Sequence, residues 1–250
     1  MKVLITAGGT SESIDSVRSI TNHSTGRLGS IIADKFAHKN ANVTYVYGEK
    51  AALPSHKNIE IVPVKNVQGL QETFGSLFER DKYDCVIHSM AVSDFTPQAV
   101  ITFDDIVKSL SGVDTQNIAP DELAQKIRNT VLASTKPLTG GKIYSKQTDL
   151  MVLLKQTPKV IKQVKTQQPE TILVGFKLLV GVPECELVQT AKEFLTQNNC
   201  DFVLANDLHK INNDSHKAIL IDKNGNMQRA NTKQEIATAI YNAVYERINR

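Results

Sequence analysis

The chain has 250 residues, enough for one sizeable α/β domain or two small ones, and its 41% hydrophobic content suffices for a real core. Its 29 basic and 26 acidic residues leave a net charge of +3, which indicates no nucleic-acid surface but leaves small anionic ligands open. No window approaches 18 apolar residues, and the N-terminal apolar run is too short for a signal peptide, so we expect neither export nor membrane insertion. Cys85, Cys185 and Cys200 show no CxxC spacing and fit small buried residues of a reduced cytoplasmic protein.

Short β-branched runs alternate with segments of helical period along the chain. The expected strands are 2–6, 42–47, 59–63, 84–89, 171–177 and 202–205. The expected helices are 29–39, 67–80, 120–131, 158–166, 183–198 and 233–248. This alternation predicts a Rossmann-like, doubly wound α/β fold, with a mostly parallel sheet and helices on both faces.

The alternation breaks between residues 95 and 150, where polar residues, prolines and paired glycines interrupt the apolar pattern. We expect a single domain, 1–250, in which this stretch leaves the sheet. Residues 133–149 have no usable period and are interpreted as a flap or a dimer arm. Residues 208–222 read as a loop with a short peripheral strand.

Two glycine clusters follow the first expected strand, within TAGGTSESIDSVRSITNHSTGRLG (residues 6–29). Gly8 and Gly9 belong to the first cluster, and Ser24 and Gly26 to the second. Glycines let backbone N–H groups approach phosphate oxygens, and a helix N-terminus adds partial positive charge. The connection is far longer than the tight GxGxxG turn of a dinucleotide loop. Together the clusters predict a phosphate subsite, whereas either one alone would read as a turn or a helix cap.

A polar insert with Arg18 and Asn22 separates the two clusters, and it also contains Asp15 and His23. A guanidinium suits bidentate anion binding, and an amide both donates and accepts hydrogen bonds. A solvated loop with Asx turns is the competing interpretation for each of these residues taken singly.

The fourth expected strand ends in IHSMAVSDFTP, at the edge where doubly wound sheets bind ligands. The small residues Ala91 and Ser93 would let a ligand lie close. Asp94 could accept a hydrogen bond from a ribose or base, or help to hold a metal, and helix capping is the alternative for it. His88 lies within the strand and reads as a core histidine.

Lys142 follows the glycine pair in GGKIYSKQ, and Lys146 comes four residues later. A lysine on a glycine-hinged flap can close over an anionic transition state and supply charge only when substrate is bound. The chain has 29 basic residues, so an ordinary surface lysine is the competing interpretation.

Taken in order, the long first motif and then AVSDF, GKIYSK, TPKVI, VGFKL and LAND resemble phosphopantothenoylcysteine synthetases, also called phosphopantothenate-cysteine ligases. The resemblance spans roughly residues 3–222. It implies a ligase that joins the carboxylate of 4′-phosphopantothenate to the amine of L-cysteine in coenzyme A biosynthesis. Bacterial members activate the carboxylate with CTP as an acyl-cytidylate, and eukaryotic relatives use ATP; the resemblance favours CTP.

The resemblance also implies roles for individual residues. Asn22 matches the asparagine that contacts the acyl intermediate and assists attack by cysteine, and Lys142 matches the flap lysine that supports acyl-nucleotide formation. Arg18 and Ala91 join Asn22 as substrate-binding positions. The implied nucleotide-binding positions are Gly8, Gly9, Ser24, Gly26, Ser93, Asp94, Lys142, Thr157, Pro158, Lys159, Val160 and Phe176. Mg²⁺ is expected to be held mainly by the nucleotide phosphates, so no dedicated metal-ligand cluster is predicted.

Some positions depart from the family pattern. Many bacterial members have lysines where this chain has Phe194 and Asn198. Lys177 in VGFKL resembles the eukaryotic form instead, although Leu179 stands where that form has a glutamate. The residues at these positions therefore do not decide whether the nucleotide is CTP or ATP.

The family works as a dimer in which one subunit completes the neighbour's site, so a homodimer is expected. Because the sequence starts at the synthetase strand, we expect the stand-alone bacterial form, without a preceding flavin-dependent decarboxylase.

Two other functional classes are alternatives: a nicotinamide-dependent Rossmann oxidoreductase and a non-catalytic nucleotide-binding protein. The missing GxGxxG spacing and the missing YxxxK pattern oppose the first. A non-catalytic nucleotide-binding protein would not require a flap lysine.

Overall fold

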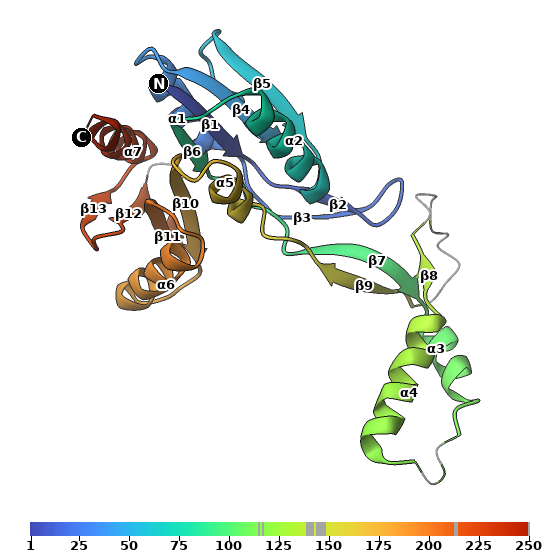
Figure 1. The fold of residues 1–250 in the computed structure, drawn as a ribbon. Coiled ribbons are helices and arrows are strands. Elements are labelled where there is room, and N and C mark those ends of the chain that lie inside the picture. The colour runs from blue at the N-terminus through green and yellow to red at the C-terminus, as the bar shows by residue number, and fades with distance from the viewer. Residues whose placement is uncertain (115, 117, 139–142, 144–148, 213–214, 250) are drawn as a thin grey trace. The chain divides into compact units, whose positions relative to one another are not determined.

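The computed structural model describes residues 1–114, 116, 118–138, 143, 149–212 and 215–249 (Figure 1). It divides the chain into two compact units, which are described separately. Unit 1 comprises Met1–Ser11, Thr21–Ser93 and Pro158–Arg250, and unit 2 comprises Glu12–Ile20 and Asp94–Thr157. The stretch expected to leave the sheet falls within unit 2. No helix of the described residues is both long enough and apolar enough to cross a membrane.

Unit 1 is built on an eight-stranded sheet. Its order is β13-β12-β11-β10-β6-β1-β4-β5. The parallel strands are β1 (Lys2–Ala7), β4 (Asn42–Gly48), β5 (Ile59–Val64), β6 (Cys85–His88), β10 (Ile172–Leu179) and β11 (Phe202–Ile211). The antiparallel strands are β12 (His216–Asp222) and β13 (Met227–Ala230). Central strands such as β1 are apolar on consecutive positions because both of their faces are covered. The predicted doubly wound fold is confirmed.

Helices cover both faces of this sheet (Figure 1). One face packs against α1 (Arg27–Ala37) and α7 (Lys233–Ile248). The other face packs against α2 (Val67–Arg80), α5 (Ile161–Gln167) and α6 (Glu184–Gln197). Ile236, Ile240 and Val244 recur every four residues in α7 and are completely buried, so this face of the helix packs on the sheet, whereas Ile248 at its end is exposed.

Side chains fix where two of these helices begin. The Asn66 side chain accepts a hydrogen bond from the Gly69 amide (2.9 Å) at the start of α2. The Thr232 hydroxyl accepts from the Glu235 amide (3.2 Å) at the start of α7, and the Glu235 carboxylate accepts in return from the Asn231 amide (2.9 Å). These caps satisfy backbone donors that the first helical turn leaves free.

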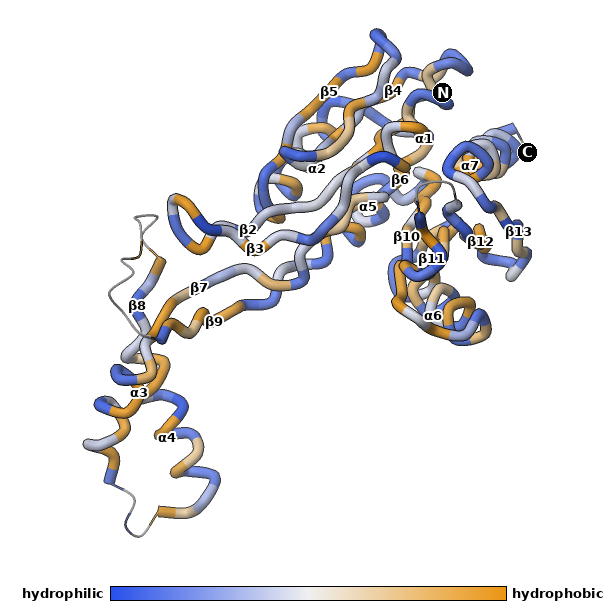
Figure 2. Tube along the Cα trace, turned by 180° about the vertical axis from the view of Figure 1, so that it is seen from behind, coloured by the Kyte–Doolittle hydropathy of each residue, from blue (hydrophilic) through white to orange (hydrophobic). Residues whose placement is uncertain are grey.

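The described part of unit 2 contains small sheets and two helices. Strands β2 (Ser11–Ser13) and β3 (Ser19–Thr21) form a hairpin, and residues Glu12–Ile20 of this hairpin belong to unit 2. Strand β7 (Phe95–Ile101) pairs antiparallel with both β8 (Lys136–Pro137) and β9 (Met151–Gln156). The helices are α3 (Phe103–Leu110) and α4 (Pro120–Ala133), and neither has a buried residue. Figure 2 shows apolar stretches along both of them.

The structure differs from several sequence expectations. Strands β7 and β9 and helix α3 were not predicted, because short half-exposed elements carry a weak periodic signal and Pro97 interrupts the first strand. The stretch 208–222, expected to be a loop with a short peripheral strand, contains more strand than expected, because β11 continues to Ile211 and β12 fills His216–Asp222. Cys85 and Cys200 are buried as expected, whereas Cys185 is exposed. Most of the expected flap, including Lys142 and Lys146, lies outside the described residues.

Candidate functional site

The two glycine clusters meet in unit 1 beyond the carboxyl end of β1. Gly8 (φ +81°) and Gly26 (φ +68°) both adopt the left-handed conformation, which favours glycine. A Cβ added to Gly8 would lie 2.5 Å from the Ala51 Cβ, and one added to Gly26 would lie 2.7 Å from the same atom. The clusters, 18 residues apart in sequence, therefore pack around one alanine. Gly8 and Gly26 are buried in this packing and Gly9 is partly exposed, and the phosphate subsite expected at these clusters stays a prediction.

The chain after β1 is held to the chain after β6. Gly9 and Ala91 form an isolated parallel bridge, and the Ala91 amide donates to the Gly8 carbonyl (2.8 Å). The Thr10 hydroxyl accepts from the Ser93 amide (2.9 Å) and donates to the Ser93 hydroxyl (3.0 Å), and both side chains are buried. The hydrogen bonds between Thr10 and Ser93, which sequence reasoning did not predict, lock these two strand ends together.

Asn22 lies against the same pair of strand ends. Its side-chain amide donates to the Val92 carbonyl (3.2 Å), with the Ala91 carbonyl at 3.4 Å. Its own carbonyl stands only 2.6 Å from where a Gly9 Cβ would be. The structure thus brings together Gly9, Asn22 and Ala91, three of the predicted site residues, and leaves the Asn22 side chain exposed. Ser24 follows in the same loop.

Arg18 belongs to unit 2, where it forms an ion pair with Asp15. Its Nε and Nη2 atoms lie 2.9 and 2.5 Å from Asp15 Oδ2. The Arg18 guanidinium and the Val17 amide hold the pKa of the Asp15 carboxyl well below its usual range. Arg18 Nη2 also donates to the Ile143 carbonyl (2.9 Å), and the Ile143 amide donates to Asp15 Oδ2 (3.1 Å). The pair therefore fixes the backbone position that follows Lys142. The Arg18 side chain remains 47% exposed, so one part of its fork can still meet an anion.

Asp94 and Thr157 lie together in unit 2, where the Thr157 amide donates to the Asp94 carbonyl (2.9 Å). The Asp94 side chain is exposed, and strand β7 follows it. The helix-capping alternative for Asp94 is therefore wrong. Pro158 and Lys159 are exposed before α5, while the Val160 side chain is buried in the core of unit 1. Val160 can therefore offer a ligand its backbone only.

The departures from the family pattern have local structural roles in unit 1. Lys177 Nζ lies 5.9 Å from the centre of the Phe194 ring, a cation–π distance. The Asn198 amide donates to the Phe194 carbonyl (2.9 Å) at the end of α6. Phe176, the residue before Lys177, is half-buried and pairs with Leu204 in the sheet. The positive charge beside the Phe194 ring therefore comes from Lys177 of β10.

The buried histidines are structural. His88 Nδ1 lies 2.9 Å from the Thr6 hydroxyl, and burial lowers the His88 pKa to about 4. This confirms the core role predicted for His88. His216 Nε2 lies 3.0 Å from the Asn206 amide nitrogen, and burial lowers its pKa to about 4 as well. Among the described residues, no three histidine, cysteine, aspartate or glutamate side chains gather in a way that could hold a metal ion.

The fold and these strand ends define an α/β protein of the Rossmann-like, doubly wound class, with a candidate glycine-lined site beyond the carboxyl ends of β1 and β6. The chain belongs to the family described as the DNA/pantothenate metabolism flavoprotein C-terminal domain, whose profile matches residues 1–115 and 134–248. The resemblance found in the sequence motifs is thereby confirmed for the family.

Individual relatives agree with this assignment. The chain is 31% identical over 244 residues to the coenzyme A biosynthesis bifunctional protein CoaBC of Thermococcus kodakarensis, covering 97% of this chain and 50% of that protein. The chain spans about half the length of the curated relatives it matches most extensively.

Two solved structures have the same fold. The DNA/pantothenate metabolism flavoprotein from Streptococcus pneumoniae is 37% identical, with a TM-score of 0.82 and coverage of 98% of this chain and 99% of that one. A Cab2 H337A mutant in complex with phosphopantothenate-cysteine is 18% identical, with a TM-score of 0.64 and coverage of 100% and 89%. The second likeness concerns the fold alone.

Proposed function

We propose that the chain is a ligase that forms the amide bond between 4′-phosphopantothenate and L-cysteine, through an acyl-cytidylate made from CTP. Membership of the pantothenate-metabolism family supports the substrate class, and the relative from Thermococcus kodakarensis is named for coenzyme A biosynthesis. The observation that carries the proposal is the meeting of the two glycine clusters at Ala51, with Asn22 and Ala91 beside them.

The chemistry has two steps. A carboxylate oxygen of 4′-phosphopantothenate attacks the α-phosphorus of CTP, forming an acyl phosphate bond as pyrophosphate leaves. The cysteine amine then attacks the acyl carbon, loses a proton and displaces CMP. Both steps need backbone donors around the phosphates and shielding of the mixed anhydride from water.

The residues divide between these tasks. The loops at Gly8, Gly9 and Gly26, which pack together around Ala51 and Asn22, supply backbone N–H groups to the phosphates, with Gly9 the partly exposed member. The exposed Asn22 amide, anchored to the strand-end carbonyls, orients the acyl group for attack. Lys142 and Arg18 supply positive charge, Lys142 in the activation step. Mg²⁺, bound chiefly through the nucleotide phosphates, would neutralise their charge.

An endpoint assay tests the reaction directly. The chain is incubated with 4′-phosphopantothenate, L-cysteine and either CTP or ATP, and both pyrophosphate and product mass are followed. We expect turnover with CTP. Turnover with ATP alone would correct the nucleotide, and no turnover with either would overturn the ligase proposal.

Asn22→Asp separates the two chemical steps. Activation should survive while cysteine transfer slows, so that acyl-nucleotide accumulates in a quenched single-turnover reaction. Asn58→Asp, which places the same charge on an exposed loop of unit 1, is the matched control. Unaltered transfer kinetics in Asn22→Asp would remove Asn22 from the mechanism.

Lys142→Gln distinguishes the ligase from a non-catalytic nucleotide-binding protein. The ligase should lose acyl-nucleotide formation, whereas a binding protein would keep its nucleotide affinity and its function. Lys192→Gln, on the exposed side of α6, serves as the control for loss of one positive charge.

We also propose that the chain works as a homodimer whose contact includes unit 2. Helices α3 and α4 bury none of their residues, and they expose Phe103, Val107, Ile127 and Leu132. Exposed apolar side chains of this number on two short helices are typical of a surface that a protein partner covers. A second copy of the chain presents the same apolar face, as a two-fold contact requires.

A further inference from the structure

Unit 1 has a cavity at the opposite edge of the sheet from the glycine clusters. Its volume is about 360 Å³, within the range of small-molecule sites. Phe202, Leu220 and Ala243 form its apolar lining, and Phe202 is the first residue of β11. The glycine clusters lie beyond the carboxyl ends of the parallel strands, whereas this cavity lies where β11 begins. The two sites are therefore separate within unit 1.

The carboxylates at the cavity are already engaged. Asp201 Oδ2 accepts from Lys165 Nζ (2.8 Å) and from the Leu173 amide (3.0 Å). Asp222 holds the turn after β12 by accepting from the Asn226 side chain (2.8 Å) and from the backbone amides of Asn224 and Asn226 (2.9 Å each). Both carboxylates therefore already have partners within the protein.

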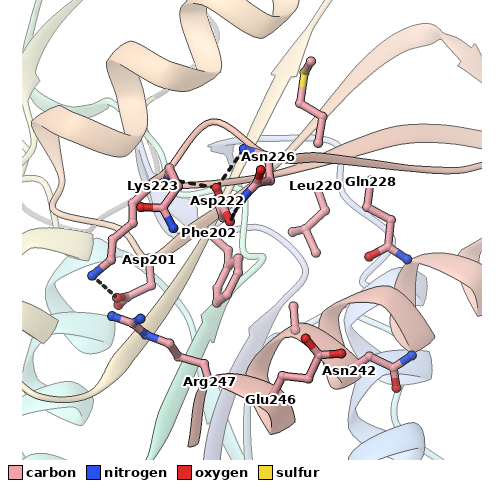
Figure 3. Close-up of a pocket in the computed structure, with 13 residues that line it drawn as sticks. Asp201, Phe202, Leu220, Asp222, Lys223, Asn226, Gln228, Asn242, Glu246 and Arg247 are labelled. Atoms are coloured by element: carbon pink, nitrogen blue, oxygen red, sulfur yellow. Dashed lines mark hydrogen bonds and ion pairs between the residues drawn. The ribbon is translucent and has the colours of Figure 1, made fainter. Parts of the chain in front are cut away.

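Positive charge exceeds negative charge at the Asp201 end. Lys223 Nζ lies 3.7 Å from Asp201 Oδ1, a loose ion pair with the lysine 46% exposed. Figure 3 shows the Arg247 side chain reaching toward the same carboxylate from the last turn of α7. Lys165 and Lys223 therefore both pair with this one carboxylate, and Arg247 adds a further positive charge to the lining of the cavity. The arrangement favours an additional anionic group, which Arg247 can bind in bidentate fashion.

The far end of the cavity has different chemistry. Asn242 and Glu246 project from α7, and Gln228 projects from β13 (Figure 3). These side chains offer amide and carboxylate oxygens to a hydrogen-bond donor. The Phe202 ring lies between this end and the cationic end and provides a face for an apolar or planar body (Figure 3).

We propose that this cavity is a second ligand site, which binds a small organic anion. The anion's carboxylate or phosphate lies between Lys223 and Arg247, its apolar body lies on Phe202, and a hydrogen-bond donor at its other end faces Glu246 and Asn242. The site does not depend on the proposed ligase function, because it shares no residue with the glycine-lined site.

Binding of matched probes tests the proposal. Isothermal titration with 4-aminobenzoate and with 4-aminophenyl phosphate distinguishes a carboxylate ligand from a phosphate ligand, and 4-aminobenzamide is the uncharged control. We expect at least one of the two anions to bind saturably, with the benzamide at least about tenfold weaker, and salt to weaken binding of the anion. No saturable binding of either anion, or equal binding of the benzamide, overturns the proposal.

Substitutions then locate the bound anion. Arg247→Gln and Lys223→Gln should each weaken its binding several-fold, their combination should weaken it more than tenfold, and Arg247→Lys should restore part of the loss. Arg128→Gln on α4 and Lys192→Gln on α6 remove charge from exposed positions elsewhere and should change nothing. Because Arg247 and Lys223 are exposed, circular dichroism should show native folding of all variants. Unchanged affinity in the folded double variant would place the anion elsewhere and overturn the assignment.

Discussion

Different interactions stabilise unit 1 and unit 2. Both large apolar clusters of the described chain lie in unit 1, and its helices α1, α2, α5, α6 and α7 all bury residues against the sheet. In unit 2 the helices bury none, and the ion pair between Asp15 and Arg18 holds one of its loops. A region that buries little apolar surface of its own gains stability from polar contacts or from a partner. The predictions below test that difference.

The largest effect is expected from truncating the core of unit 1. Phe36→Ala empties a fully buried position on α1 and should lower the free energy of unfolding by about 3 to 5 kcal/mol. Phe103→Ala removes the same side chain from an exposed position on α3. It should lower the free energy of unfolding of the monomer by less than about 1 kcal/mol. Urea unfolding measures both, with hydrogen exchange to assign the loss to a unit. Equal losses would contradict the contrast between the units.

Acid should weaken unit 1 in particular, because all six histidines of the chain lie in it. The pKa of His88 falls from 6.5 to about 4 on burial, so its neutral form stabilises the fold above pH 6.5. That contribution, about 3 kcal/mol, is lost as the pH falls from 6.5 toward 4, because the unfolded chain takes up the proton first. Burial lowers the pKa of His216 as well, so its protonation also decreases the free energy of unfolding as the pH falls.

The measurement is the unfolding free energy at several pH values for the wild type, His88→Asn and the exposed control His38→Asn. His88→Asn should flatten the dependence between pH 6.5 and 4, and His38→Asn should retain it. Parallel curves for the wild type and His88→Asn would show that His88 is not its source.

A charge on the apolar surface of unit 2 should weaken self-association rather than folding. Val107 is 53% exposed on α3, and Val107→Asp should raise the dimer dissociation constant at least about tenfold, because a carboxylate would be buried in the contact. Lys108→Asp puts the same carboxylate on a polar position of α3 and should have a smaller effect. Light scattering over a concentration series measures both, and a monomeric wild type at assay concentration would refute the homodimer.

The smallest effect is expected at the ion pair of unit 2. The Asp15 pKa is lowered by Arg18, so the pair contributes stability above the ordinary aspartate pKa that is lost on acidification below it. Asp15→Asn should speed hydrogen exchange at the Ile143 amide near neutral pH. In this variant, protection of the Ile143 amide should also depend less on acidification than in the wild type. Asp121→Asn, on the exposed face of α4, is the control. Unchanged exchange at Ile143 would show that the pair does not order this backbone.

Long, strongly periodic segments could be predicted from the sequence, and short ones could not. Helix α2 matches its expected range, 67–80, because its apolar spacing and its Asn66 cap are both local signals. Strand β9 could not be predicted, because it is stable only through pairing with β7, which is distant in sequence. The glycine clusters at Gly8 and Gly26 could be proposed as a site, but Ala51, around which they close, gives no signal of its own.

The sequence by itself determined the doubly wound class and the family, because β-branched runs, helical periods and motif order are properties of neighbouring residues. Tertiary structure decided which distant residues meet. It placed Asn22 on the carbonyls after β6, joined Arg18 and Asp15 to the backbone of Ile143, and brought Lys165 and Lys223 to Asp201. These juxtapositions depend on strand order and helix packing, which bring together side chains far apart along the chain.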